Sequence, residues 1–191
     1  MITPQELKEI IKEYNKNHRK YLDALLEYYK NLSSLKEAII CAGDAKDHTG
    51  KRHPHQRRLK KNTLKNFKKK LIKKKDKIQN VKTFDELFKI VEECKVKGIG
   101  DLTIYDTALR IGAKLGLTPE VIYLHAGTKE GAKKLLNKKR FTSKFICKES
   151  LPTPFLDKDL TPAHLEDILC IYKDRFGGSK KNKKYLCIPQ K

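Results

Sequence analysis

The sequence lacks tryptophan, has a single methionine, and contains few acidic residues for its many basic ones. It also lacks an uninterrupted apolar run of about 18 residues, which excludes an ordinary membrane-spanning helix. The five cysteines are far apart and form no Cys-x-x-Cys pair, so we expect reduced thiols without disulfides. The chain begins with polar and acidic residues, unlike a secretory signal peptide. We therefore expect a cytoplasmic protein, nucleoid-associated or, in a eukaryote, nuclear.

Positive charge is what the chain has in excess. Its 44 Lys and Arg residues oppose 23 Asp and Glu residues, a formal net charge of +21. Residues 51–80 alone contain 14 Lys or Arg and one acid, Asp76. A segment with so much like charge repels itself and is stabilised by an acidic partner. Nucleic acid is the partner we expect, and a helical adaptor for an acidic protein is an alternative.

The first forty residues predict a long helix. Thr3 and Glu6 form a capping box around Pro4, and apolar residues then follow at alternating steps of four and three, typical of a heptad seam. The seam comprises Leu7, Ile11, Tyr14, His18, Tyr21, Leu25, Tyr28, Leu32, Leu35 and Ile39. A break near residues 15–17 or at Asn31 would instead give a hairpin of two helices.

Residues 56–80 predict a second, very basic helix. Its apolar stripe comprises Leu59, Leu64, Phe67, Leu71, Ile72 and Ile78, with lysines on the other sides. The loop between the two predicted helices is short, so we expect the basic helix to cover the heptad seam as an antiparallel partner. A homodimer through the seam is the competing arrangement.

A Gly-x-Gly turn lies between two amphipathic stretches. Residues 96–103, Val-Lys-Gly-Ile-Gly-Asp-Leu-Thr, and the apolar stretch after them resemble a helix-hairpin-helix DNA-binding motif, over residues 84–117. The motif's pattern is a hydrophobic residue, Gly, a hydrophobic residue, Gly, two variable positions and Thr. The resemblance implies that hairpin amides hold a backbone phosphate, without reading base sequence. A glycine-rich corner between packed helices is the alternative.

A second glycine turn follows. Thr118-Pro119-Glu120 predicts the start of a helix that contains residues 121–124. Gly127 then ends that helix and Thr128 caps the next. This arrangement predicts a second phosphate clamp with Lys129 and Lys133, and a tight structural corner is an equally favoured interpretation.

The loop of residues 43–58 concentrates three of the six histidines. A metal site for phosphodiester hydrolysis, formed by Asp47, His48, His53 and His55, is one interpretation. A polar loop whose histidines contact water or phosphate is the interpretation we favour, because these residues fit no nuclease motif.

Base-excision DNA glycosylases contain the same hairpin, so we compared their pattern. The family's catalytic Lys, where present, follows the second Gly by two residues, and this chain has Leu102 there. The family's essential Asp lies about twenty residues further on, where Glu120 is the sole carboxylate. Both departures argue against glycosylase chemistry.

We therefore predict an all-α protein that binds duplex DNA through its backbone, without catalysis or cofactor and without a membrane. A nucleic-acid-processing enzyme, nuclease or glycosylase-like, is the second hypothesis. Residues 1–80 would form a basic helical arm or hairpin, 81–178 a core with the helix-hairpin-helix element, and 179–191 a basic tail. The predicted nucleic-acid contacts are Arg57, Arg58, Lys68, Lys69, Lys73, Lys74, Lys97, Gly98, Ile99, Gly100, Thr103, Arg110, Lys114, Thr128, Lys129 and Lys133.

Overall fold

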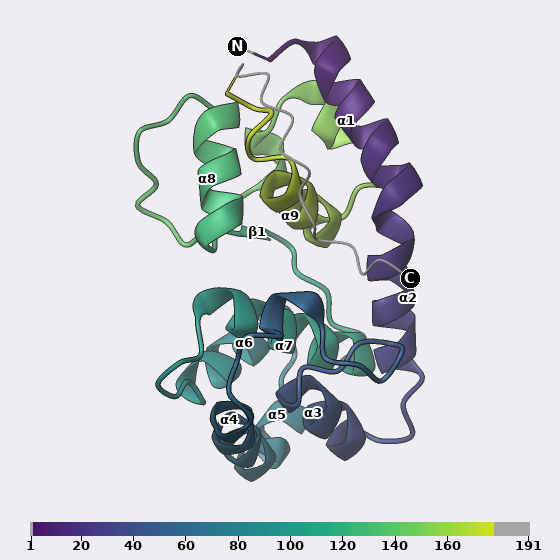
Figure 1. Ribbon diagram of the computed structural model, residues 1–191, viewed down its shortest axis with the longest axis vertical. Coiled ribbons are helices and arrows are strands. Elements are labelled where there is room, and N and C mark those ends of the chain that lie inside the picture. Colours follow the sequence, from purple (N-terminus) through teal and green to yellow (C-terminus); the bar gives the residue numbers. More distant parts are fainter. Residues whose placement is uncertain (1, 178–191) are drawn as a thin grey trace. The chain divides into compact units, whose positions relative to one another are not determined.

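The protein is mostly helical, as the computed structural model of residues 2–177 shows (Figure 1). The α-helices within these residues are α1 (Pro4–Asn17), α2 (Arg19–Lys30), α3 (Leu35–Gly43), α4 (Lys61–Lys73), α5 (Lys75–Gln79), α6 (Phe84–Glu93), α7 (Asp101–Leu115), α8 (Ala126–Leu135) and α9 (Pro162–Ile171). Short 3₁₀ helices are η1 (Pro54–Gln56), η2 (Lys148–Ser150) and η3 (Thr153–Leu156). The predicted all-α class is confirmed. The predicted basic tail lies outside the described residues.

Two compact units make up the structure. The terminal unit combines the described residues up to Leu22 with those from Glu120 onward, and the central unit is Asp23–Pro119. These units comprise different residues from the arm (1–80) and the core (81–178) expected from the sequence. The reason is that α1 packs against η3 and α9, whereas α3 packs against α4 and α7.

The predicted long helix is divided into three. The first break is at His18, whose φ of −124° leaves the helical region, and the second is the turn at residues 31–34. Ser34 begins α3 because its hydroxyl accepts a hydrogen bond from the Glu37 amide. Both alternative break points are thus used. Seam residues such as Leu7 and Ile39 are buried within the chain, so covering them requires no second copy.

The basic helix is also shorter than expected. It divides into α4 and α5 at Lys74, and residues 56–60 before it lie in η1 and a turn. The expected stripe is confirmed on α4, where Leu64, Phe67 and Leu71 are buried. Helix α4 packs against α3, so it pairs with the last part of the predicted seam and not with all of it.

The terminal unit contains the one two-stranded sheet found within residues 2–177. β1 (Ile122–Tyr123) pairs with β2 (Phe145–Ile146) in antiparallel register, Ile122 opposite Ile146. The helix predicted for residues 118–124 is therefore wrong. The β-branched and aromatic residues of this segment favour an extended strand over a helix.

Helices α8 and α9 pack side by side with close backbone approach (Figure 1). A Cβ on Gly131 of α8 would overlap the backbone carbonyl oxygen of Leu169 on α9. Gly127, which is predicted to end a helix, instead lies within α8, as does Gly131. Their function is to let the two helices approach.

Replacing Gly131 by Ala should lower the free energy of unfolding by about 2 kcal/mol, since the added methyl group overlaps backbone atoms that cannot rotate away. Urea unfolding measures the change. Gly177→Ala is the matched control, because its Cβ would lie an ordinary 3.6 Å from Lys134. Equal stability of the two variants would contradict the close packing of α8 on α9.

Candidate functional site

A basic groove lies on the central unit between the loop after α3 and the first turns of α4. Its volume is about 570 Å³. The lining residues are Asp44, Lys46, Gly50, Arg52, Lys61, Asn62, Leu64, Lys65, Lys68 and Lys69. Six of these side chains carry positive charge and one, Asp44, carries negative charge. The Asp44 carboxylate accepts two hydrogen bonds from Lys68 Nζ, at 2.7 and 2.8 Å, so the groove is positively charged overall.

The lysines of this groove are displayed by the pattern of α4. Because Leu64, Phe67 and Leu71 face the core, Lys61, Lys65, Lys69 and Lys73 are left on the exposed side. These four lysines follow one another at every fourth residue. They therefore form a row that advances about 6 Å per step and about 18 Å in all.

The loop that forms the other wall is held in place by Asp47. Its carboxylate accepts hydrogen bonds from the Thr49 and Lys51 amides, at 2.9 and 3.1 Å, and from the Thr49 hydroxyl. Burial acts to raise the pKa of Asp47, but these hydrogen bonds outweigh burial and hold the pKa below its usual value. Asp47 thus shapes the loop. It is not among the clustered groups that could hold a metal ion in the described part of the chain.

The glycine turn joins α6 to α7, so a helix flanks it on each side. Ile99 is 3% exposed and anchors the turn in the core, whereas Gly98 and Gly100 are exposed. Gly98 has a φ of +94°, which favours glycine. Gly100 is the N-cap of α7 and offers no side-chain cap, and nothing lies within 4 Å of where its Cβ would be. The first amides of α7 are therefore approachable from solvent.

Helix α4 lies beside this turn. A Cβ on Gly98 would be 3.3 Å from the Thr63 methyl group, and Lys70 Nζ donates a 3.3 Å hydrogen bond to the Lys95 carbonyl. Asp101, in the first turn of α7, pairs with Lys95 at 2.7 Å. The turn therefore packs against α4 through Thr63 and Lys70.

Several predicted phosphate contacts are instead structural. Arg110 is 1% exposed and Thr103 is 7% exposed, because α7 is surrounded by other helices on most sides. Lys114 Nζ donates to the carbonyl oxygens of Lys30 and Leu32 at the end of α2. Lys68 and Lys74 pair with Asp44 and Glu93. Of the remaining predicted cations of the central unit, Arg57, Arg58, Lys69, Lys73 and Lys97 are exposed.

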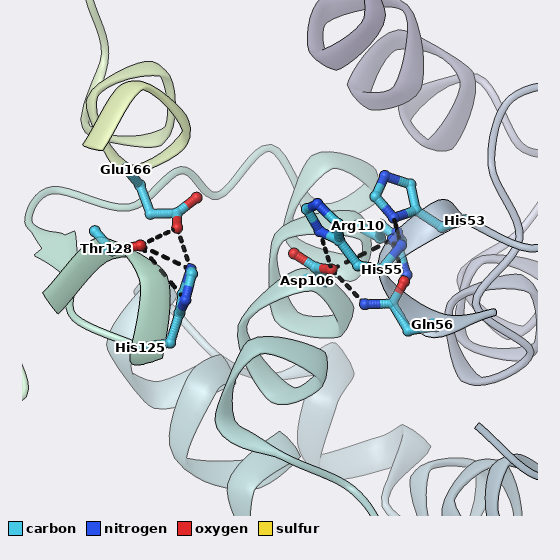
Figure 2. Close-up of polar contacts among 8 residues, drawn as sticks. All are labelled: His53, His55, Gln56, Asp106, Arg110, His125, Thr128 and Glu166. Carbon is cyan, nitrogen blue, oxygen red and sulfur yellow. Dashed lines mark hydrogen bonds and ion pairs between the residues drawn. The ribbon is translucent and has the colours of Figure 1, made fainter. Parts of the chain in front are cut away.

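The second predicted clamp is wrong. Thr128 lies inside α8 and is fully buried. Its hydroxyl donates a 2.5 Å hydrogen bond to Glu166 of α9 and lies 2.9 Å from His125 Nε2, while His125 also contacts Glu166 (Figure 2). These three residues form a buried polar link between α8 and α9. Lys129 and Lys133 remain partly exposed on the terminal unit.

A second polar cluster lies in the central unit, where His53, Gln56 and Arg110 are buried and His55 is exposed (Figure 2). It consists of His53, His55 and Gln56 around η1, and Asp106 and Arg110 on α7. Gln56 connects the two charged groups, since its Nε2 donates to Asp106 Oδ2 at 2.5 Å and its Oε1 accepts from Arg110 Nη2 at 3.2 Å. The sequence placed His53 and His55 with Asp47 and His48. The structure brings them to Asp106 instead, about fifty residues along the chain.

Burial and charge control ionisation in this cluster. Burial, reinforced by the Arg110 charge, lowers the pKa of His53 to about 3, so the ring is neutral at pH 7. Burial alone would raise the pKa of Asp106, but His55 and the Arg110 guanidinium outweigh it and hold that pKa below its usual value. Asp106 is therefore an ionised carboxylate beside a neutral imidazole and a guanidinium.

Comparisons of this chain with protein families, with curated proteins and with solved structures found no match. The resemblance to a helix-hairpin-helix motif stays a prediction. Within residues 2–177, none of the helices combines the length and apolar character needed to cross a lipid bilayer.

The lowered pKa of His53 predicts acid sensitivity. Below about pH 6.5 the unfolded chain takes up a proton at His53 that the folded protein excludes until about pH 3. Stability should therefore fall on acidification, with a contribution of up to about 1.4 kcal/mol per pH unit. Urea unfolding with EDTA between pH 6.5 and 4.5 measures the slope. His53→Gln should flatten it, and identical slopes in parent and variant would contradict a buried neutral His53.

Proposed function

We propose that the central unit binds nucleic acid, preferably duplex DNA, through backbone phosphates and without regard to base sequence. The basic groove is the observation that supports this most directly: six cationic side chains line a concavity whose single carboxylate is already paired. A groove with this balance attracts polyanions.

The lysine row on α4 fits the charge density of a duplex. B-DNA carries about one phosphate charge per 1.7 Å of helix axis, so the 18 Å row from Lys61 to Lys73 would face roughly ten phosphates of both strands. Lysine ammonium groups act as mobile point charges and do not form the fixed fork with which arginine reads guanine. Such a row supports affinity more than base specificity.

The glycine turn would add directional contacts to this charged surface. The amides at the start of α7 suit a phosphate oxygen, because they lack intrahelical acceptors and carry the positive end of the helix dipole. Lys97 is exposed on the turn, and Lys95 offsets the nearby Asp101 carboxylate. The turn would therefore fix the position of a backbone that the lysines attract.

Salt dependence is the first test. If about six phosphates are neutralised, log affinity for duplex DNA should fall with log salt at a slope of about −5, equally for unrelated sequences. Fluorescence anisotropy at several salt concentrations measures it. Lys61→Glu, Lys65→Glu and Lys69→Glu together should weaken binding at least a hundredfold and reduce the slope by about 3.

The matched control carries the same charge change on the terminal unit: Lys12→Glu, Lys16→Glu and Lys20→Glu, all exposed in the parent. This control should retain most of the affinity. An equal loss in both triple variants would show a general effect of net charge and contradict the groove. Equally tight binding of polyglutamate would favour an acidic protein partner instead.

Gly100→Val tests the glycine turn separately. Gly100 has a φ of −94° and ψ of 171°, an extended conformation that Val adopts readily, and its Cβ would meet no atom within 4 Å. The fold should persist, whereas DNA affinity should drop about tenfold or more through obstruction of the α7 amides. Anisotropy titrations and thermal melts are read together. A folded variant with parental affinity would remove the turn from the interface.

A further inference from the structure

The polar cluster of the central unit contains a set of metal-binding groups. One nitrogen each from His53 and His55 and a carboxylate oxygen of Asp106 all lie within 4.8 Å of one another. His55 Nδ1 is 3.6 Å from Asp106 Oδ2 (Figure 2). This is the one such three-residue group that the described residues form.

The spacing is close to that of a bound ion. With metal–ligand bonds of about 2.1 Å, tetrahedral geometry places ligand atoms about 3.4 Å apart. The longest separation here therefore needs to shorten by little more than 1 Å. Of the three residues, His55 is the exposed member, so its ring can reorient most readily.

The backbone and its neighbours hold the other two groups. The His53 amide donates to the Ala45 carbonyl at 2.8 Å, and Pro54 fixes the chain direction immediately afterwards. Asp106 projects from α7, where Gln56 Nε2 bonds its Oδ2 at 2.5 Å. A hydrogen-bonded neighbour that orients a ligating carboxylate is the usual support of a metal site.

The ligand types select the ion. Two imidazoles and one carboxylate favour Zn²⁺ and similar first-row ions over Mg²⁺ or Ca²⁺, which prefer all-oxygen sites. Arg110 Nη2, 3.7 Å from Asp106 Oδ2, offsets the carboxylate charge. The ion must therefore gain most of its affinity from the imidazole nitrogens, and we expect micromolar binding.

We propose that His53, His55 and Asp106 bind one divalent transition-metal ion of the Zn²⁺ type. With three protein ligands, the ion keeps at least one coordination position for water. The site is separate from the lysines and glycines assigned to nucleic-acid binding, so its test requires no nucleic acid.

The experiment uses the tag-free full chain, first stripped with EDTA. Isothermal titration calorimetry with Zn²⁺ should give one site per chain, and Co²⁺ should develop the visible absorption of a nitrogen- and oxygen-ligated ion. His55→Ala should weaken Zn²⁺ binding at least tenfold and abolish the Co²⁺ bands. Its fold should persist, because the residue is exposed.

His48→Ala is the matched control, since His48 lies in the same loop outside the three-residue group. It should bind both ions like the parent. Asp106→Asn keeps the side-chain shape and should also weaken Zn²⁺ binding, with circular dichroism checking the fold. Absence of Zn²⁺ binding in the parent, or equal binding by the parent and His55→Ala, would overturn the proposal.

Discussion

Repulsion among the lysines of α4 is the constraint on which the central unit depends. Like charges at such density favour an extended chain, and the helix persists because its apolar stripe is buried. Leu64, Phe67 and Leu71 are each at most 2% exposed. Burial on this side requires the lysines to gather on the other. The groove is thus a direct result of how α4 is held against its neighbours.

Within the central unit, acidic side chains neutralise some of the lysines and leave others exposed. Lys68 and Lys74 are paired with acids, which reduces repulsion near the core, whereas Lys61, Lys65, Lys69 and Lys73 are exposed to solvent. Deeper in the unit, Gln56 joins η1 to α7, because its side chain forms hydrogen bonds with the opposite charges of Asp106 and Arg110. Charged groups therefore hold both ends of the loop that faces α4, through the Lys68–Asp44 pair and through the Gln56 hydrogen bonds.

Local patterns predicted local structure well. The Thr3 capping box and the α4 stripe both appear where short-range residue spacing indicates them. The helix predicted at residues 118–124 is wrong because the strand preference of the β-branched and aromatic residues outweighs the proline-based start signal before them. The role of Thr128 does not follow from its local sequence, because its hydrogen-bond partner Glu166 lies 38 residues away.

The candidate site is only partly predictable, because some of its residues are placed by contacts between segments that are distant in the sequence. Exposed lysines follow from helical periodicity, but the burial of Arg110 depends on which helices surround α7. Asp106 was missed as a partner of His53 and His55, although its spacing of four residues from the buried Arg110 is a signal that the two charges share a face. Contacts between distant segments require the tertiary fold.

The terminal unit is assembled from both ends of the described chain, and this affects the order of events during synthesis. Leu7, Ile10 and Tyr14 of α1 emerge from the ribosome long before α9, against which α1 packs and which begins only at Pro162. The central unit is complete well before that point. We therefore expect the nascent chain to expose an apolar α1 while Asp23–Pro119 folds, which makes this helix a natural binding site for chaperones until α9 has been synthesised.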